Sequence, residues 1–187
     1  MPNPSIADLV SAARDADAHL GTTRLILIDG PAGSGKTTLG GRLGAALGAQ
    51  VLHADDIYEG WTGLTSMWPV LGTQILAPLA QGQAASFAAW DWAASARGER
   101  IDVPVAPWLV IEGVGVAQRS ARPFASLILY VEAPFSERLR RGIARDGEAM
   151  RDDWRRWQVA EAAHHQAELT RENSHVIIDG AAPVPDQ

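Results

Sequence analysis

The sequence predicts an α/β fold in which helices flank a parallel β-sheet. Short apolar segments alternate with helical patterns, and a glycine-rich phosphate-binding motif joins the first apolar segment to the next helix. In addition, acidic residues follow two other apolar segments. Strands joined by right-handed crossovers end at one edge of a parallel sheet, so these polar groups should meet there. We expect one domain over residues 1–187.

Residue periodicity predicts each element in turn. Helical patterns cover residues 5–20, 37–47, 73–79, 136–145 and 154–171. Apolar strands cover residues 25–28, 51–53, 109–113, 127–131 and 176–178, which predicts a five-stranded sheet. Between them we expect a loop over 59–73, an ambiguous stretch over 85–92, a turn over 97–100 and a frayed tail after Gly180.

Residues 30–38 form a complete G-x-x-x-x-G-K-[ST] motif between a strand and a helix. Its glycines let backbone N–H groups curl around a phosphate, and the following helix adds the positive end of its dipole. Lys36, the only lysine in the chain, would reach the β- and γ-phosphates, and Thr37 would ligate Mg²⁺. The motif predicts an ATP·Mg²⁺ site formed by Gly30, Ala32, Gly33, Ser34, Gly35, Lys36, Thr37 and Thr38.

Composition excludes several classes of protein and partner. The net charge of −6 and the lack of a long basic run argue against nucleic acid or an anionic membrane as the main partner. With no cysteine, the chain has neither disulfides nor a thiolate metal site. Residues 1–18 lack the apolar core of a signal peptide, and no apolar run has the length of a membrane span. We expect a cytoplasmic protein that acts on a small-molecule phosphoryl acceptor, as a monomer or a homo-oligomer.

Three acidic residues follow predicted strands. Asp55 could take the proton from a substrate hydroxyl or hold Mg²⁺ through water, and Asp56 is the weaker candidate for this role. Either residue could instead cap a helix. Glu112 ends a strand, and the glycines at 113 and 115 leave room beside it, which favours a metal role over a solvent-facing one. The predicted metal ligands are Thr37, Asp55 and Glu112.

Arginines recur on the helix predicted over 136–145. Spacings of three and four place Arg138, Arg141 and Arg145 on one face. An Arg-rich lid over about 138–157 would supply the positive charge that a transferring phosphoryl group needs. The alternative is a solvated helix face balanced by neighbouring acids.

Aromatic residues gather in the segment after the two aspartates. Of seven tryptophans, Trp61, Trp68, Trp90 and Trp92 lie in the expected substrate-side loops of residues 56–100. They could stack on a substrate or fill the core. By contrast, His164 and His165 are expected at the surface or in a capping contact, because adjacent residues do not share a helix face.

From about Leu25 to Gly180 the chain resembles the uridine kinase/phosphoribulokinase-like family of phosphate-loop (P-loop) kinases, within the P-loop NTPases. The resemblance rests on residues 30–38, Asp55-Asp56-Ile57-Tyr58, Trp90-Asp91-Trp92 with Arg97, Ile111-Glu112-Gly113, and Arg138-Leu139-Arg140-Arg141 with Arg145-Asp146. It implies a three-layer P-loop kinase fold with an Arg-rich lid. It also implies that Asp55 is the general base, that Tyr58, Trp90 and Arg97 bind the acceptor, and that Glu112 holds magnesium. Lys36, Arg138 and Arg141 would be catalytic, and Arg145 would bind the nucleotide.

The acceptor site departs from the family pattern. The histidine that contacts the nucleoside in the family is Ser95 here, and the tyrosine of the same stretch is Trp90. The acid that holds the ribose hydroxyls has no counterpart in residues 63–69. These departures predict that the phosphotransfer machinery is retained while the pyrimidine nucleoside site is not.

Together these features predict an ATP-dependent, uridine kinase-like phosphotransferase. It would move the γ-phosphate of ATP to a hydroxyl of a small metabolite or nucleoside. A nucleoside monophosphate kinase is an alternative, with Arg97, Arg119 and Arg122 as candidates for holding the acceptor phosphate. A non-catalytic nucleotide-binding regulatory module is a third reading, although it would need neither the acid at Asp55 nor the lid. A GTPase is disfavoured, because its Asn-Lys-x-Asp motif needs a second lysine.

Overall fold

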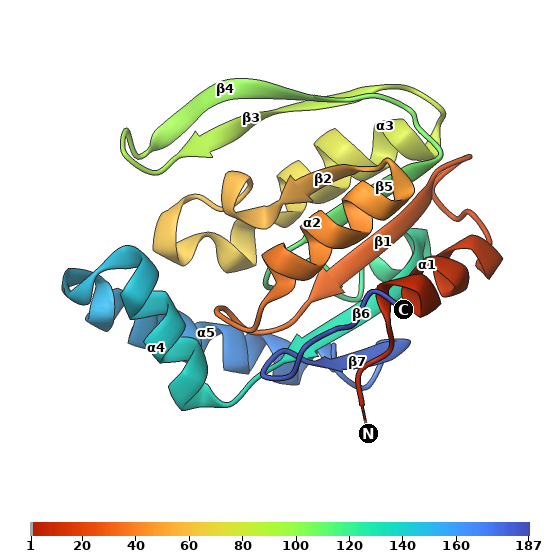
Figure 1. Ribbon diagram of the computed structural model, residues 1–187. Coiled ribbons are helices and arrows are strands. Elements are labelled where there is room, and N and C mark those ends of the chain that lie inside the picture. The colour runs from red at the N-terminus through yellow and green to blue at the C-terminus, as the bar shows by residue number, and fades with distance from the viewer. Residues whose placement is uncertain (1) are drawn as a thin grey trace.

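Five parallel strands form the central sheet of the computed structural model, which describes residues 2–187 (Figure 1). The strands are β1 (Arg24–Asp29), β2 (Gln50–His53), β5 (Trp108–Glu112), β6 (Ala125–Glu132) and β7 (Val176–Asp179). Their order across the sheet is β2-β5-β1-β6-β7, and every neighbouring pair is parallel. The predicted α/β class and five-stranded sheet are confirmed.

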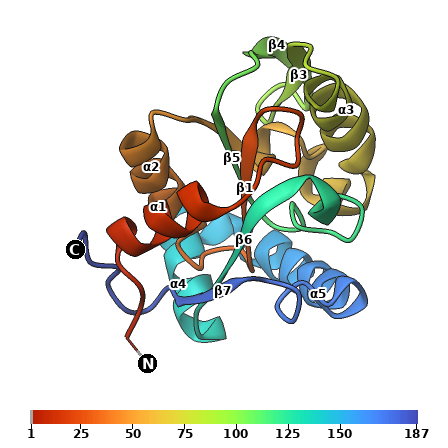
Figure 2. The ribbon, with the colours of Figure 1, turned by 90° about the vertical axis from the view of Figure 1, so that its right-hand side faces the viewer.

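Helices cover both faces of the sheet (Figure 2). They are α1 (Ile6–Asp15), α2 (Lys36–Leu47), α3 (Ala77–Ala80), α4 (Phe135–Asp146) and α5 (Arg151–Glu168). Strand β1 shows why both faces need a cover, because its successive side chains enter different cores. Ile26 and Ile28 pack with α1 and α2, whereas Leu25 and Leu27 pack with the aromatic and aliphatic side chains on the α5 side.

The segment after the two aspartates is helical, and the predicted loop over 59–73 is wrong. It forms a 3-10 helix over Gly60–Ser66 and a π-helix over Pro69–Leu76 that continues into α3. The physical reason is burial, since Leu64, Leu71 and Ile75 are almost fully enclosed in the α5-side core. Tertiary packing thus gives regular structure to a segment whose local composition resembles a loop.

A two-stranded antiparallel sheet stands apart from the main one (Figure 1). Strand β3 (Ala85–Asp91) pairs with β4 (Ala96–Val103), so the ambiguous stretch is a strand and the predicted turn over 97–100 is wrong. The reversal lies at residues 92–95, where the Asp91 carboxylate accepts the N–H groups of Ala93 and Ala94. Ser95 completes it with a positive φ of 51°.

The C-terminal segment packs on the start of the chain, so the expected fraying after Gly180 is also wrong. The carbonyls of Pro185 and Asp186 accept the N–H groups of Ile6 and Ala7, at 2.8 and 3.2 Å. Arg42 on α2 donates to the carbonyl of Val184 at 2.6 Å. The tail therefore satisfies backbone donors in the first turn of α1 that would otherwise lack partners.

The carboxyl ends of three adjacent strands form the edge that carries the candidate site. The phosphate-binding loop leaves β1, the aspartates follow β2, and Glu112 ends β5. Register places Glu112 level with His53 on one side and Ile28 on the other. The predicted convergence of these polar groups at one edge is confirmed.

Candidate active site

The loop over residues 30–35 can be built only with glycine at particular positions. Gly30, Gly33 and Gly35 have φ values of 134°, 78° and 111°. A Cβ at Gly30 would lie 2.1 Å from the Val131 carbonyl oxygen, and one at Gly33 would lie 2.6 Å from that of Arg138. These glycines let the loop pass directly against β6 and α4.

The loop presents a cluster of backbone donors. Within residues 2–187, no protein acceptor bonds the N–H groups of residues 33 and 35–38, and the Ser34 hydroxyl is buried without a partner. Helix α2 begins at Lys36 without a side-chain cap and without an acid in its first turn. These residues fit a nucleotide phosphate, because uncapped donors at a helix N-terminus bind anions.

Lys36 closes this donor cluster. The residue is 7% exposed, and its Nζ donates to the carbonyl of Pro31 at 3.0 Å. The ammonium group is thus bonded to the loop itself, and an anionic ligand could compete with the Pro31 carbonyl for it.

Glu112 links the phosphate loop to β2. Its Oε1 accepts the hydroxyl of Thr37 at 3.0 Å and lies 2.7 Å from His53 Nδ1. The hydrogen bond to Glu112 raises the pKa of His53, which burial opposes, and the charges of Glu112, Asp56 and Asp55 add to the increase. Two of the three predicted metal ligands, Thr37 and Glu112, are therefore in direct contact.

Asp55 stands in a single 3-10 turn over Ala54–Asp56. Its side chain reaches solvent, yet loss of hydration to the surrounding protein raises its pKa, and the charge of Glu112 adds to this. Lys36 and Arg145 act in the opposite direction. Loss of hydration also raises the pKa of Asp56. The pKa of Asp55 therefore depends on the charges of Glu112, Lys36 and the lid residue Arg145.

Thr37, Asp55 and Glu112 offer the oxygen ligands that Mg²⁺ prefers. In the described part of the chain, no group of three or more His, Cys, Asp and Glu side chains encloses a metal ion. Mg²⁺ keeps several waters and takes phosphate oxygens as ligands alongside one or two carboxylates, and the Thr37 hydroxyl with the carboxylates of Asp55 and Glu112 fits this pattern.

The lid arginines occupy two different environments. Arg138 donates to Glu161 at 2.7 Å and to the Ala32 carbonyl at 3.2 Å, whereas Arg141 donates to the carbonyls of Gly33 and Gly180. Both guanidinium groups therefore bind the carbonyl side of the phosphate loop. Contact of these two residues with a transferring phosphoryl group stays a prediction.

Arg145, one turn further along α4, faces the acids. It pairs with Asp146 at 2.7 Å, and its guanidinium lies 5.8 Å from the ring centroid of Trp154. The hydrogen bonds that Arg145 donates to Asp146 raise the pKa of Arg145, burial opposes this, and the charges of Asp146, Asp55 and Glu112 add to the increase. Of the predicted lid residues, Arg145 is the one whose charge acts on Asp55.

Of the residues predicted to bind the acceptor, Tyr58 is buried, Trp90 and Arg97 are partly exposed, and Asp55 is exposed. Tyr58 is 1% exposed, and its hydroxyl donates to the Val114 carbonyl within the core. Arg97 donates to the Ile57 carbonyl and to Glu59, both at 2.9 Å, and stacks on Trp90. In this structure Tyr58, Trp90 and Arg97 buttress the turn that carries Asp55.

Other tryptophans lie nearer to Asp55. The Trp61 ring makes edge-to-face contacts with those of Trp92, Trp154 and Trp157, at centroid distances of 5.7, 6.3 and 6.1 Å. Trp92 is 41% exposed, and its Nε1 donates to the Asp55 carbonyl at 2.9 Å. A tryptophan cluster thus connects the aspartate turn with the lid, and Trp92 is its exposed member, because Trp154 and Trp157 are buried.

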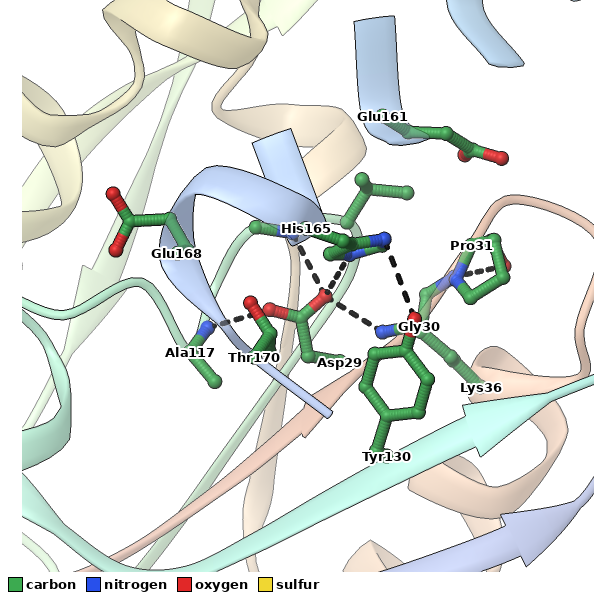
Figure 3. Close-up of polar contacts among 12 residues, drawn as sticks. Asp29, Gly30, Pro31, Lys36, Ala117, Tyr130, Glu161, His165, Glu168 and Thr170 are labelled. Atoms are coloured by element: carbon green, nitrogen blue, oxygen red, sulfur yellow. Dashed lines mark hydrogen bonds and ion pairs between the residues drawn. The ribbon is translucent and has the colours of Figure 1, made fainter. Parts of the chain in front are cut away.

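Sequence reasoning missed a buried polar network behind the loop (Figure 3). Asp29 accepts the N–H groups of Gly30, Gly115 and Ala117 at 2.6–2.8 Å, and His165 Nε2 lies 3.1 Å from its carboxylate. Burial acts to raise the pKa of Asp29, but these hydrogen bonds and the charge of His165 outweigh it and leave the pKa lowered. The surface position expected for His165 is wrong, because its side chain is only 10% exposed. An acid directly before the phosphate motif was the available signal.

No protein-family model and no curated protein sequence matches this chain. Solved structures do match. A possible uridine kinase from Bacillus stearothermophilus superposes with a TM-score of 0.64 at 21% identity, covering 93% of this chain and 97% of that one. A provisionally named fructose transport system kinase from Silicibacter sp. TM1040 gives a TM-score of 0.69 at 20% identity, with coverages of 92% and 98%.

These similarities extend over nearly the whole length of both matched chains. They show that the chain has the α/β fold of P-loop kinases, with its five-stranded parallel sheet flanked by helices. Separately, no helix within residues 2–187 is both long enough and apolar enough to cross a membrane.

Proposed function

We propose that this protein is an ATP-dependent phosphotransferase that moves the γ-phosphate of ATP to a hydroxyl of a small metabolite. One observation carries the proposal. An acid with a raised pKa, Asp55, stands at the same sheet edge as a preformed phosphate loop whose Thr37 is bonded to Glu112. Base, metal ligands and phosphate donors are the three parts that phosphoryl transfer to an alcohol requires.

The chain's own residues divide the work. The N–H groups of residues 33 and 35–38 and the Lys36 ammonium would bind the triphosphate, while Thr37 and Glu112 would hold Mg²⁺. A magnesium ion held by these residues would supply positive charge that offsets the negative charge of the phosphates. Asp55 would accept the proton of the attacking hydroxyl, and its raised pKa makes it a better base than an ordinary aspartate.

Arg145 is the lid residue that we assign to the transferring phosphoryl group. Its charge already acts on Asp55 and Glu112, whereas Arg138 and Arg141 are bonded to the carbonyl side of the loop. A cation beside the developing charge stabilises the transition state more than the ground state.

An alcohol acceptor is favoured over a nucleoside monophosphate. The arginines that could hold an acceptor phosphate are bonded to the chain itself. Arg97 donates to the Ile57 carbonyl, Arg119 to that of Ala167, and Arg122 to those of Ala117 and Glu168. The similar structures are named as kinases, one with uridine and one with a fructose transport system, which supports phosphotransfer without specifying the acceptor.

The test is an ATP-consumption screen against nucleosides, nucleoside monophosphates, sugars and vitamin precursors, with Mg²⁺ present. We expect turnover with an alcohol from this panel and none with the Lys36→Ala variant, which should keep the wild-type circular dichroism spectrum. Tight ATP binding without turnover of any acceptor would favour the regulatory module. Turnover of a nucleoside monophosphate alone would favour the second enzyme class.

A further inference from the structure

Helix α5 holds the phosphate loop through two buried side chains one turn apart, Glu161 and His165 (Figure 3). Glu161 Oε2 accepts the N–H of Ala32 at 2.7 Å. His165 Nε2 contacts Asp29, which in turn accepts the N–H of Gly30 at 2.6 Å. A spacing of four residues places both side chains on the same helix face. The first residues of the loop are thus bonded, directly or through Asp29, to one helix.

Glu161 does not act alone, because Arg138 neutralises its charge. The Arg138 guanidinium lies 2.7 Å from Glu161 Oε1, and the two side chains are 11% and 2% exposed. The same guanidinium donates to the carbonyls of Ala32 at 3.2 Å and Ala133 at 3.1 Å. One ion pair therefore holds both the N–H and the C=O of Ala32.

Stability alone is a weak reason for such a pair. Removing two charges from water is costly, and well-packed apolar side chains often stabilise a fold as much or more. The ion pair also fixes the orientation of the N–H and C=O groups of Ala32. Ala32 directly precedes Gly33, with its left-handed φ of 78°, where the N–H groups without protein acceptors begin.

We propose that Glu161 and Arg138 are positioning residues that fix Ala32, so that the following N–H groups are already directed at the nucleotide phosphates. The pair also joins three elements at that point, since Arg138 belongs to α4 and Glu161 to α5. The inference rests on the proposed nucleotide site. It can nevertheless be tested without phosphotransfer, because the order of the loop is itself measurable.

The experiment measures two quantities in each variant, the deuterium exchange of residues 30–38 and the dissociation constant for ATP·Mg²⁺. Glu161→Gln keeps an oxygen for the Ala32 N–H but removes the charge that pairs with Arg138. We expect faster exchange in residues 30–38 and an ATP dissociation constant about tenfold higher, because a charge-assisted contact is lost. In the double variant Glu161→Gln/Arg138→Gln, no buried charge is left unpaired, so the loss should be smaller than the sum of the single losses.

The matched control is Arg171→Ala, which removes an exposed ion pair with Glu132 just beyond the end of α5 and outside the lid. It should leave exchange and affinity at their wild-type values. If Glu161→Gln lowers only the melting temperature and changes neither quantity, the pair is merely structural and the inference is overturned. Should Glu161→Gln not fold, Glu161→Asp keeps the charge but is one methylene shorter. Wild-type exchange and affinity in that variant would overturn the inference equally.

Failure of the proposed function gives a different result. A wild-type protein that binds ATP but phosphorylates no acceptor contradicts the phosphotransferase proposal, and both measurements still apply. If the wild type binds no ATP, the exchange of residues 30–38 alone decides whether Glu161 orders the loop.

Discussion

At the scale of single residues, Lys36 can be examined by chemistry that no other side chain shares. It is the only side-chain amine in the chain, and its Nζ is bonded to Pro31 at the mouth of the loop. An amine-reactive reagent should therefore label Lys36 and the N-terminal amine, and ATP should protect Lys36 alone. Mass spectrometry of the digested protein measures both, with the N-terminal label as the internal control. Unchanged labelling of Lys36 at saturating ATP would contradict the phosphate-loop assignment.

Asp55 should show the signature of a general base. Replacing it by asparagine keeps the shape and removes the proton acceptor, so kcat should fall by a factor on the order of 10²–10⁴ with little change in ATP affinity. Asp56→Asn is the matched control in the same turn and should do less. Steady-state kinetics with the acceptor found in the screen make the comparison. A larger effect at Asp56 would move the base by one residue.

Asp29 makes a prediction about pH. Its pKa is lowered in the fold from an ordinary value of 3.8, so its stabilising effect is present above that value and is lost as pH falls through the lowered pKa. Asp29→Asn should reduce the free energy of unfolding at neutral pH by about 1–3 kcal/mol, because it turns a donor towards buried N–H groups. The gap between variant and wild type should shrink below pH 3.8.

Urea denaturation between neutral and acid pH measures this gap. Asp152→Asn, at an exposed position on α5, should track the wild type throughout. A gap for Asp29→Asn that is constant over the whole pH range would show that the Asp29 carboxylate contributes no charge-dependent stability.

At the scale of elements, the β3–β4 hairpin contacts the turn that carries Asp55, the proposed base. Trp92, at the hairpin tip, donates its Nε1–H to the Asp55 carbonyl at 2.9 Å. Trp92→Phe keeps an aromatic ring but loses that bond, worth about 1 kcal/mol net, so kcat should fall roughly fivefold while ATP affinity stays constant. Trp108→Phe, at the opposite end of β5, is the control. An equal loss of ATP affinity would place the effect in the phosphate loop instead.

Elements of the main sheet could be predicted from the sequence because they are local. Each strand is a short apolar run, and the phosphate motif fixes the order of strand, loop and helix at 24–47. The helical segment over 60–76 could not be predicted, because its backbone follows from burial of leucines scattered among glycines and tryptophans. The hairpin was missed for a similar reason, since Arg97 and Arg100 of β4 look like turn residues until their partners on β3 are known.

The candidate site divides in the same way. The phosphate loop, Asp55 and Glu112 could be placed at one edge because strand ends converge in a parallel sheet. The different contacts made by the arginines of α4 could not be predicted from the sequence. Spacing puts Arg138 and Arg145 on one helix face. Only the fold shows that Arg138 pairs with Glu161, whereas the charge of Arg145 acts on Asp55.

At the scale of the whole molecule, separate segments assemble a tryptophan cluster that reaches Asp55 through Trp92. Trp61 comes from the 3-10 helix, Trp92 from the hairpin, and the buried Trp154 from α5. The exposed ring of Trp92 and the partly exposed ring of Trp61 favour an acceptor whose reacting hydroxyl is attached to an apolar or aromatic body. Uridine and cytidine should be poor acceptors, because their polar edges would go unpaired.

Tryptophan fluorescence measures this preference. Uridine, cytidine and a panel of non-nucleoside alcohols would be titrated in the presence of a non-hydrolysable ATP analogue. We expect quenching by alcohols with apolar or aromatic bodies and little response to the two nucleosides. Micromolar quenching by uridine, together with efficient 5′-phosphorylation, would restore a plain uridine kinase assignment.

Residues 184–186 pack against α1 and α2, so the C-terminal segment contacts the N-terminal part of the chain. Asn3 bonds the backbone of Asp179, near the far end of the sequence. A short peptide joining the ends would span little distance. New ends could then be opened at Gly82, a left-handed residue in open space between α3 and β3. We expect such a permuted chain to form the same fold, although its elements would be synthesised in a different order.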